Sequence, residues 1–468
     1  MILSELILSE NGKANFGKME LNRKIFREYD IRAVYQEDLK GDLPYFLGRS
    51  FGTMVRRAGK KTVCIGGDNR LTTPEIKYKL LKGILETGCD VTDTGIVPTP
   101  VLYFSIHNYG FDAGVMVTAS HNPPEFNGFK LVIGNKSLYG GEIQQAANLM
   151  EKEDFETGKG RSFRKNAVQD YTNLMVRKFR FKRKLRVAID TGNGTLGPVI
   201  VPLFEKLSID FVPLYTESDP AFPNHLPDPV VPENLKDLTR TVTDGRLDIG
   251  LGYDGDGDRL GVVDDEGKVL WGDQLLIIYA REILKKAPGQ KVIFDVKCTR
   301  ALEEEIGKAG GIPLMWKTGH SLIEDKMHKE RAPLAGELSG HLYFADDYYG
   351  YDDAIYASLR LLDILDRTGK KTSALLDGVK KYHSTPEIRI AVSDEKKFEV
   401  VEKIKAVFTA KNSRISDIDG VKVFFADGWA LVRASNTQPA LVVRAEAEEA
   451  ESLERIKNDF LETIKKFI

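Results

Sequence analysis

The sequence predicts an α/β protein in which three related, mixed α/β domains follow one another and a C-terminal α+β domain ends the chain. Its 468 residues exceed what a single hydrophobic core normally supports, so several domains are expected. One local pattern also occurs three times: a short apolar strand ends at or just before an aspartate, and a helix follows. This alternation indicates sheets with parallel strands, whose C-terminal ends carry the ligand-binding loops.

The three copies of this pattern are widely spaced, which excludes a solenoid of short repeats. The aspartates are Asp68, Asp190 and Asp295. Strands are predicted at residues 63–65, 187–190 and 292–295, and the helices after them at residues 73–85, 199–207 and 301–309. Three tandem domains of one type are therefore the simplest interpretation.

The last part of the chain has a different order of elements. A helix with Phe398, Val401, Ile404 and Phe408 on its apolar face precedes strands, and a helix with Leu453, Ile456, Phe460 and Ile464 closes the chain. This pattern predicts an α+β domain. The domains are expected at residues 1–165, 166–268, 269–380 and 381–468, and the first twenty residues are interpreted as a loosely held extension.

Composition excludes several classes of function. The chain has 67 Lys and Arg residues and 69 Asp and Glu residues. This balance lacks the excess of positive charge expected of a protein that binds nucleic acid or an anionic membrane. Cys64, Cys89 and Cys298 are too scattered for a disulfide framework and are expected to be buried thiols. No membrane span or secretory signal is expected. A cytoplasmic protein, monomeric or weakly homo-oligomeric, is predicted.

The first candidate site follows an apolar strand at residues 115–117. The chain then turns polar, with Ser120 and His121 before two prolines, and a second strand is expected at residues 129–133 after a tight turn at 127–128. Ser120 would lie on a stiff loop with Lys130 nearby, which suits covalent catalysis by a hydroxyl. From these residues alone, an ordinary polar turn remains an alternative.

The second candidate site is the acidic run DGDGDR at residues 254–259, between strands at 249–253 and 260–263. Asp254, Asp256 and Asp258 alternate with glycines, so their carboxylates can converge on one hard cation, and Mg²⁺ is the expected ion. A calcium-binding EF-hand loop is excluded, because it needs glycine at the position of Arg259 and helices on both sides. A solvated acidic turn is the other alternative.

Two further polar loops follow in the third predicted domain. Residues 336–341 read GELSGH, and if they are extended, Glu337, Ser339 and His341 face one way, which suits reading sugar hydroxyls. Residues 317–321 read KTGHS and form another strand-end loop. For His320, a structural role and a binding role are equally compatible with the sequence.

The fourth candidate site lies near the C-terminus, where residues 433–439 read RASNTQP and Arg444 follows. Two arginines, hydroxyls and an amide can clamp a dianion, and guanidinium geometry suits phosphate. The chain has no phosphate-binding P-loop and no dinucleotide fingerprint, so the phosphate is expected to belong to a small substrate.

Taken together, these stretches resemble the α-D-phosphohexomutases, most closely the phosphomannomutase/phosphoglucomutase branch. Four motifs occur in the family's order: TASHNP at residues 118–123, DGDGDR at 254–259, GELSGH at 336–341 and RASNT at 433–437. The resemblance covers nearly the whole chain. It departs at Ala33, where the family usually has glycine, and at Gly67, where a basic residue is common.

The resemblance implies a reaction in which hexose 1-phosphate and hexose 6-phosphate interconvert through an enzyme phosphoserine, Ser120, and a hexose 1,6-bisphosphate. Asp254, Asp256, Asp258 and the Ser120 phosphate would bind Mg²⁺, and Arg259 and Lys130 would add positive charge. Lys130, His341 and Arg32 are candidates for proton transfer. Substrate contacts would come from Tyr29, Arg32, His121, Lys297, Gly319, His320, Glu337, Ser339, His341, Arg433, Ser435, Asn436, Thr437 and Arg444.

The expected partners are the 1- and 6-phosphates of mannose and glucose, with the 1,6-bisphosphate as activator. Three alternatives remain open at this stage. A non-enzymatic sugar-phosphate binder would not need Ser120 or the acidic loop, and a metal-dependent phosphatase would transfer phosphate to water. An N-acetylglucosamine or glucosamine phosphate mutase usually carries glutamine at the position of Leu338.

Overall fold

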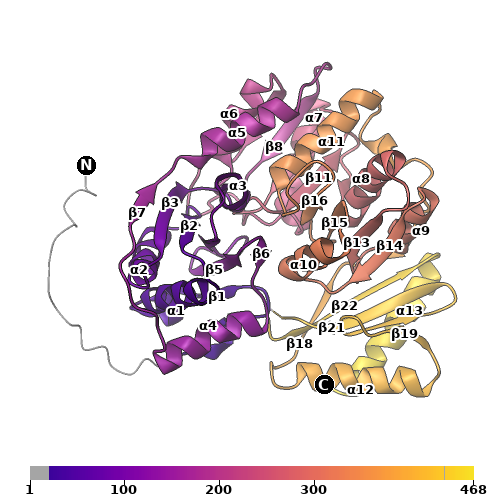
Figure 1. The fold of residues 1–468 in the computed structure, drawn as a ribbon. Helices are drawn as coiled ribbons and strands as arrows, with labels where there is room; N and C mark the ends of the chain where they lie inside the picture. Colours follow the sequence, from indigo (N-terminus) through magenta and orange to yellow (C-terminus); the bar gives the residue numbers. More distant parts are fainter. Residues whose placement is uncertain (1–20, 437) are drawn as a thin grey trace.

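The computed structural model describes residues 21–436 and 438–468, and its four β-sheets follow one another along the chain (Figure 1). We name the units built on these sheets domains I to IV. In Figure 1, domain I lies at the left, domain II at the top, domain III at the right and domain IV at the lower right. The chain thus curves back and brings domain IV beside domain I, where Arg27 lies 3.5 Å from Asp394. The predicted extension at residues 1–20 and Thr437 lie outside the described residues.

Domain I has a mixed sheet in the order β1-β5-β4-β2-β3-β7, and the short β6 pairs with β5. Strand β2 is parallel to β3 and β4, whereas β5 is antiparallel to both β4 and β1. Its elements are η1 Arg23–Ile25, β1 Ile31–Val34, η2 Tyr35–Leu39, α1 Leu43–Arg57, β2 Thr62–Gly67, α2 Thr73–Leu85, β3 Asp90–Ile96, α3 Thr99–Tyr109, β4 Ala113–Val117, β5 Phe126–Ile133, β6 Lys136–Ser137, α4 Gly141–Lys152 and β7 Ser162–Arg164.

Domains II and III have smaller sheets, in the orders β12-β11-β10-β8-β9 and β14-β13-β15-β16. Domain II comprises α5 Ala167–Lys178, β8 Arg186–Asp190, α6 Gly197–Lys206, β9 Asp210–Leu214, η3 Pro232–Leu235, α7 Lys236–Gly245, β10 Ile249–Tyr253, β11 Leu260–Asp264 and β12 Val269–Leu270. Domain III comprises α8 Gly272–Lys286, β13 Lys291–Asp295, α9 Arg300–Lys308, β14 Ile312–Trp316, α10 His320–Glu330, β15 Leu334–Gly336, β16 Leu342–Phe344, α11 Ala354–Thr368 and η4 Ser373–Leu376.

The first three domains share one topology. In each, a central strand (β2, β8 or β13) is flanked by two parallel strands, and one of these continues into an antiparallel hairpin. The hairpins are β4–β5, β10–β11 and β15–β16. The prediction of three related α/β domains is therefore confirmed, and the three hairpin loops occupy equivalent places.

Domain IV has an entirely antiparallel sheet in the order β17-β22-β21-β20-β19, with β18 also paired to β22. Two helices pack on this sheet, as the sequence predicts for an α+β domain. The elements are β17 His383–Ser384, β18 Ile388–Ala391, α12 Lys397–Ala410, β19 Arg414–Ser416, β20 Val421–Phe424, β21 Gly428–Ala434, β22 Ala440–Ala447 and α13 Ala450–Lys465.

The hydrophobic cores separate domain IV from the rest. One large cluster of buried side chains extends through domains I, II and III and includes Met116, Ile189 and Phe294. Domain IV has its own cluster, built on side chains such as Ile404 and Phe460. Between domains III and IV, the described residues form a small apolar cluster of the buried side chains Val296, Trp429 and Leu431.

Two local predictions are wrong. Residues Asn127 and Gly128 do not form a turn, because they lie inside β5 and pair with Ala33 and Arg32 of β1. Gly128 is needed for close approach of two backbones, since a Cβ there would lie 2.1 Å from the Ile31 carbonyl oxygen. Phe398 was expected on the apolar face of its helix but is 56% exposed.

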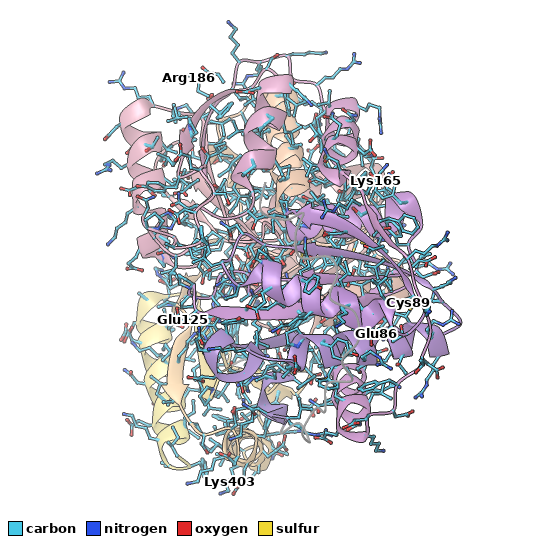
Figure 2. All side chains as sticks on the ribbon, turned by 90° about the vertical axis from the view of Figure 1, so that its left-hand side faces the viewer. Glu86, Cys89, Glu125, Lys165, Arg186 and Lys403 are labelled. Carbon is cyan, nitrogen blue, oxygen red and sulfur yellow. The ribbon has the colours of Figure 1, made fainter. Side chains whose placement is uncertain are left out.

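The three cysteines are free and buried, as predicted. None of the helices in the described part of the chain is long and apolar enough to cross a membrane. Figure 2 shows long charged side chains projecting from the periphery, with Lys403 on the outer helix of domain IV. The domain boundaries and the oligomeric state stay predictions.

Helices α1 and α2 cross closely because each has a glycine at the contact. A Cβ at Gly48 would lie 2.2 Å from the Leu80 carbonyl oxygen, and one at Gly83 would lie 2.1 Å from that of Tyr45. Such distances are far below van der Waals contact, so any side chain there would push the helices apart.

We therefore expect Gly83→Ala to lower the free energy of unfolding by about 1–3 kcal/mol, although alanine favours a helix. Gly307→Ala is the control, because Gly307 on α9 has open space around its Cβ position. That change should raise stability by about 0.5–1 kcal/mol. Urea unfolding followed by circular dichroism measures both, and a stabilised Gly83→Ala variant would contradict the packing argument.

Candidate active site

The equivalent hairpin loops of domains I, II and III meet at one place. The Ser120 hydroxyl in the β4–β5 loop donates to Asp254 Oδ2 in the β10–β11 loop at 2.6 Å. In turn, the Leu260 N–H donates to the Gly340 carbonyl oxygen of the β15–β16 loop at 3.1 Å. The repeated topology thus brings three motifs that lie far apart in the sequence into contact.

The main chain at Ser120 is held in an uncommon conformation. Its φ is 50°, in the left-handed region, and its N–H donates to Thr118 Oγ1 at 2.9 Å. The side chain is buried, and its hydroxyl also lies 3.1 Å from His121 Nδ1. Non-glycine residues in this region are strained and cluster at functional sites, which fits a reactive serine.

The three aspartates of the β10–β11 loop form a buried acidic cluster. Asp254, Asp256 and Asp258 have no exposed surface, and their oxygen atoms lie within 4.8 Å of one another. Asp254 Oδ1 accepts the N–H groups of Asp258 and Arg259, each at 3.0 Å. Thr99, the first residue of α3, donates its hydroxyl to Asp256 Oδ2 at 2.6 Å.

This cluster fits a metal ion. Asp256 Oδ1 and Asp258 Oδ1 are buried and have no hydrogen-bond partner, although buried carboxylate oxygens are normally satisfied. Three hard oxygen donors on one loop are the ligand set that Mg²⁺ or Mn²⁺ prefers. The site can therefore hold a divalent cation, and the nearby Ser120 hydroxyl faces the same cluster.

Lys130 of β5 compensates part of the negative charge. Its ammonium lies 2.9 Å from Asp256 Oδ2 and also contacts Asp258 Oδ2. Burial opposes the charge on Lys130, but the two aspartates outweigh it and raise its pKa well above its usual range. Burial and the charges of Asp258 and Asp256 raise the pKa of Asp254. The three carboxylates therefore carry more negative charge than the single ammonium of Lys130 can neutralise.

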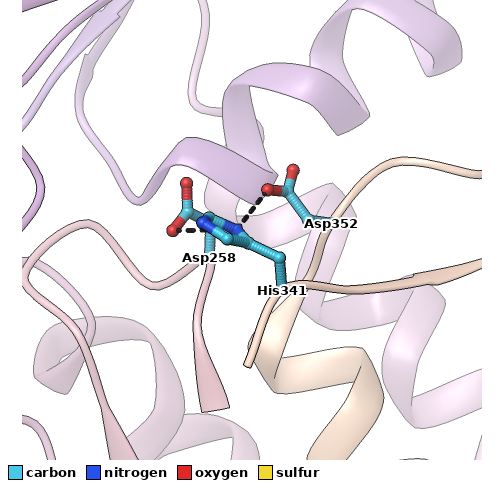
Figure 3. A group of neighbouring side chains, drawn as sticks. All are labelled: Asp258, His341 and Asp352. Atoms are coloured by element: carbon cyan, nitrogen blue, oxygen red, sulfur yellow. Dashed lines mark hydrogen bonds and ion pairs between the residues drawn. The ribbon is translucent and has the colours of Figure 1, made fainter. Parts of the chain in front are cut away.

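Figure 3 shows His341 between two carboxylates. Its Nδ1 lies 2.7 Å from Asp352 Oδ2 and 3.6 Å from Asp258 Oδ1. On the other side of the ring, Arg259 Nε donates to Nε2 at 2.9 Å. Because arginine can only donate, Nε2 carries the lone pair and Nδ1 carries the proton. Burial, together with the charge of Arg259, lowers the pKa of His341 to about 4, so the imidazole is neutral.

The β15–β16 loop presents Glu337 and Ser339 together. Residues 337–340 form a turn, which corrects the expectation of an extended segment, but the two side chains still meet: Ser339 Oγ donates to Glu337 Oε2 at 3.0 Å. Glu337 Oε1 accepts the Gly319 N–H at 2.9 Å, and burial raises the pKa of this carboxyl. His320 lies nearby, and its ring stacks on that of His341.

The hydroxyl of Tyr29 joins three domains. It donates to the Thr318 carbonyl oxygen of domain III at 2.6 Å, and it accepts from Arg433 and Asn436 of domain IV. Gly319 lies against its ring, with φ at 138°. A Cβ at that position would lie 2.3 Å from the ring, so glycine is required there.

Three of the basic residues predicted for phosphate and sugar binding, Arg433, Lys297 and Arg444, are held by contacts with acidic groups. Arg433 Nε donates to Asp419 at 2.7 Å, and Lys297 Nζ lies 2.8 Å from Glu387 of domain IV. Arg444 lies on the same face of the sheet as Arg433 but contacts the Lys297 carbonyl oxygen and Asp273. Arg444 therefore lies at the interface between domains III and IV.

Two further predicted residues lie beside the loops. Arg32 pairs with Asp30 at 2.8 Å and donates to Asn122 Oδ1 of the Ser120 loop at 2.6 Å. Ser435 is buried, and its hydroxyl accepts the Gln438 N–H at 3.1 Å. Thr437, the remaining predicted residue, is outside the described part of the chain.

Comparison with known proteins assigns the family. Models of phosphoglucomutase/phosphomannomutase match in order: α/β/α domain I at residues 23–157, domain II at 168–267, domain III at 271–382 and the C-terminal domain at 387–463. The phosphomannomutase/phosphoglucomutase of Pseudomonas aeruginosa is 42% identical over 445 residues, which cover 95% of this chain and 96% of the relative. The chain belongs to the phosphoglucomutase/phosphomannomutase family.

Other members of the phosphoglucomutase/phosphomannomutase family agree with this assignment. The phosphoglucomutase of Neisseria gonorrhoeae is 41% identical, over 94% of this chain and 96% of the relative. The crystal structure of a family protein from Burkholderia thailandensis has a TM-score of 0.90 at 40% identity, and covers 96% of this chain and 98% of that one. The resemblance and the enzyme class predicted from the four motifs are confirmed.

The motif-based prediction missed residues of this phosphohexomutase that support the loops. Thr99 contacts Asp256, Asp352 contacts His341, and Arg70 contacts the Ser120 loop. Lys397 donates to the carbonyl oxygens of Ser435 at 2.5 Å and of Gln438 at 3.2 Å. The Thr99-Pro100 pair is typical of a helix start, which could have drawn attention to Thr99. Nothing in the sequence around Asp352, Arg70 or Lys397 indicates a site.

Proposed function

We propose that this chain interconverts the 1- and 6-phosphates of mannose and glucose, with Ser120 as the phosphoryl carrier and a hexose 1,6-bisphosphate as the intermediate. The observation that carries the proposal is the contact at 2.6 Å between the Ser120 hydroxyl and Asp254 of the buried carboxylate cluster. A serine placed against a metal-binding cluster and flanked by a lysine suits phosphoryl transfer, which depends on positioning and neutralised charge.

We propose Mg²⁺ as the metal, held by Asp254, Asp256 and Asp258 together with an oxygen of the Ser120 phosphate. When bound, Mg²⁺ neutralises charge on the phosphoryl oxygens. Lys130 and Arg259 add positive charge on the same side. The chain itself fixes the oxygen ligands, because the backbone N–H groups of the loop hold Asp254 and the Thr99 hydroxyl holds Asp256.

In the first half-reaction, the bond between Ser120 Oγ and phosphorus breaks as a bond forms from phosphorus to the free 1- or 6-hydroxyl. In the second half-reaction, the bond from the other phosphorus to its sugar oxygen breaks as that phosphorus bonds to Ser120 Oγ, and the sugar oxygen takes the proton back. The hydroxyl proton must go to a base. We propose His341 for this role, because Asp352 fixes the proton on Nδ1 and Nε2 carries a lone pair, which Arg259 Nε occupies here and would release to the hydroxyl. The strong ion pairs of Lys130 keep it protonated, so it supplies charge, and Arg32 orients the loop through Asn122.

Substrate recognition is proposed to lie mainly in domains III and IV, with Tyr29 and His121 of domain I beside them. Glu337 and Ser339 would bind two adjacent ring hydroxyls, near His320, His121 and Lys297. Arg433, Ser435, Asn436 and Thr437 would bind the phosphate that is not reacting, with Tyr29 closing over it. Because the bisphosphate must turn end over end, one clamp on a separate domain has to accept both orientations.

The first test concerns Ser120. We expect Ser120→Ala to lose mutase activity by a factor on the order of 10³ or more, because the carrier hydroxyl is gone. Intact-mass measurement should show one phosphate on the wild type, but none on the variant, after incubation with glucose 1,6-bisphosphate. Ser105→Ala is the control, since Ser105 is also buried in domain I and its hydroxyl donates to the Val101 carbonyl oxygen of its own helix. Normal turnover by Ser120→Ala would exclude the phosphoserine mechanism.

The second test concerns the metal. Chelation should abolish turnover and Mg²⁺ should restore it. Thr99→Val removes the hydroxyl that orients Asp256 and should weaken Mg²⁺ binding about tenfold, measured by titration calorimetry. Thr94→Val is a matched control, because the buried Thr94 hydroxyl bonds the Ile65 carbonyl oxygen outside the cluster. Equal Mg²⁺ affinity in the two variants would show that Thr99 does not support the ligands.

The third test concerns sugar specificity. Mannose and glucose differ only in configuration at carbon 2, whereas turning the ring over nearly interchanges the 3- and 4-hydroxyls. A site that reads those two should discriminate weakly at carbon 2, so kcat/KM for the two 1-phosphates should agree within about tenfold, or about 1.4 kcal/mol. Glu337→Ala should reduce both activities alike. A preference of about a thousandfold, or loss of only one activity, would contradict this reading of the hydroxyls.

A further inference from the structure

Arg70 lies beneath the Ser120 loop and is almost completely buried, with 1% of its surface exposed. It follows the central strand β2 and precedes α2. Its Nε donates to Asp68 Oδ2 at 3.0 Å, so the buried cation has a buried anion beside it. The Phe222 ring of domain II packs over the guanidinium at 5.3 Å. A buried charge is tolerated only when it is paired and hydrogen-bonded in this way.

All other donors of Arg70 bind main-chain carbonyl oxygens of residues 120–126. Nη2 donates to Ser120 at 2.9 Å and Asn122 at 2.5 Å, and Nη1 donates to Pro123 at 2.5 Å and Phe126 at 3.1 Å. A guanidinium has five N–H donors in one plane, and here all five are used. No other side chain could bind four carbonyl oxygens and a carboxylate from one position.

These bonds act on a strained segment. The left-handed φ of Ser120 is a strained conformation for a residue other than glycine, so surrounding contacts must hold it. Arg70 binds the Ser120 carbonyl oxygen, while the Ser120 hydroxyl reaches Asp254. Asp68, which pairs with Arg70, also accepts the Ala119 N–H at 3.3 Å. The Asp68–Arg70 pair therefore binds the Thr118–Ala119 peptide, one residue before Ser120, and the Ser120–His121 peptide after it.

Comparison with domain III shows that this arrangement is particular to domain I. Asp295 is the counterpart of Asp68 and accepts the Leu338 N–H of its own hairpin loop at 3.2 Å. Two residues later stands Lys297, where domain I has Arg70. Lys297 Nζ contacts the side chains of Asp295 and Glu387 instead of carbonyl groups beneath its hairpin.

We propose that Arg70 is a positioning residue for phosphoryl transfer, whose guanidinium fixes the main chain of residues 120–126 so that Ser120 Oγ meets the carboxylate cluster. The inference rests on the proposed function. Arg70 would act only through the loop, because its donors are occupied and it has almost no surface open to substrate. Its loss should therefore change the transfer step and leave substrate binding in domains III and IV unchanged.

The test is Arg70→Lys, which keeps the charge but offers three donors without the planar fork. Misplacement of a reacting group by about 1 Å costs about 100-fold in rate, so we expect kcat to fall about 100-fold. The KM for glucose 1-phosphate should stay within about threefold, because the substrate contacts proposed for domains III and IV are intact. Intact-mass time courses should show Ser120 taking phosphate from glucose 1,6-bisphosphate correspondingly more slowly.

Arg281→Lys is the matched control. Arg281 also pairs with a carboxylate, Glu305, and donates to a carbonyl oxygen, that of Leu375, and both partners lie outside the hairpin loops. Thermal unfolding of both variants separates stability from rate. Should Arg70→Lys fail to fold, Asp68→Asn weakens the same pair with little change in shape, and a smaller fall in kcat at constant KM is expected.

An unchanged kcat in Arg70→Lys would overturn the inference, and so would equal losses in Arg70→Lys and Arg281→Lys. A rise in KM at constant kcat would also overturn it, because it would place Arg70 in substrate binding. Wild-type enzyme that takes up no phosphate on Ser120 would instead refute the proposed function. Wild-type phosphorylation with an equally fast Arg70→Lys variant refutes the role of Arg70 alone.

Discussion

Three carboxylates with no exposed surface lie within 4.8 Å of one another on the β10–β11 loop. Like charges at this distance repel strongly where water is excluded, so the cluster is stable only with compensating groups. Lys130, Thr99 and Ser120 supply them, and all three come from domain I. The packing of domains I and II therefore depends on the same contacts that build the site.

The repeated topology explains how one architecture provides three chemical functions. Each hairpin loop has an equivalent place, yet one carries a serine, one three aspartates and one a glutamate with a serine and a histidine. The aspartate after the central strand has also diverged: Asp68 and Asp295 bind N–H groups of their hairpin loops, whereas Asp190 pairs with His225. The scaffold fixes where a loop lies, and the loop residues decide what it binds.

Much of the fold was predictable because its signals are local. Apolar periodicity and strand–aspartate–helix order are visible in short windows, and the four motifs are contiguous. Asn127–Gly128 was wrongly predicted as a turn. Its glycine is needed because the backbone there lies close to that of Ile31, which is distant in sequence. Asp352 and Arg70 could not be found for the same reason: their partners, His341 and the Ser120 loop, become neighbours only after folding.

The attachment of domain IV has a consequence for how long the intermediate stays bound. One large buried cluster extends through domains I to III, whereas domain IV meets them through a small apolar cluster and polar contacts such as those of the Tyr29 hydroxyl. Hydrogen bonds of this kind contribute on the order of 1 kcal/mol each, so the free energy of detaching domain IV is a sum of small terms over these contacts. In a bisphosphate mechanism, an intermediate that escapes before turning over leaves the serine without its phosphate. Under the proposed mechanism, the contacts that hold domain IV, including those of Tyr29, Lys297 and Arg444, would govern how often the intermediate escapes. Weaker contacts would leave the enzyme dephosphorylated more often, and stronger ones would delay product release.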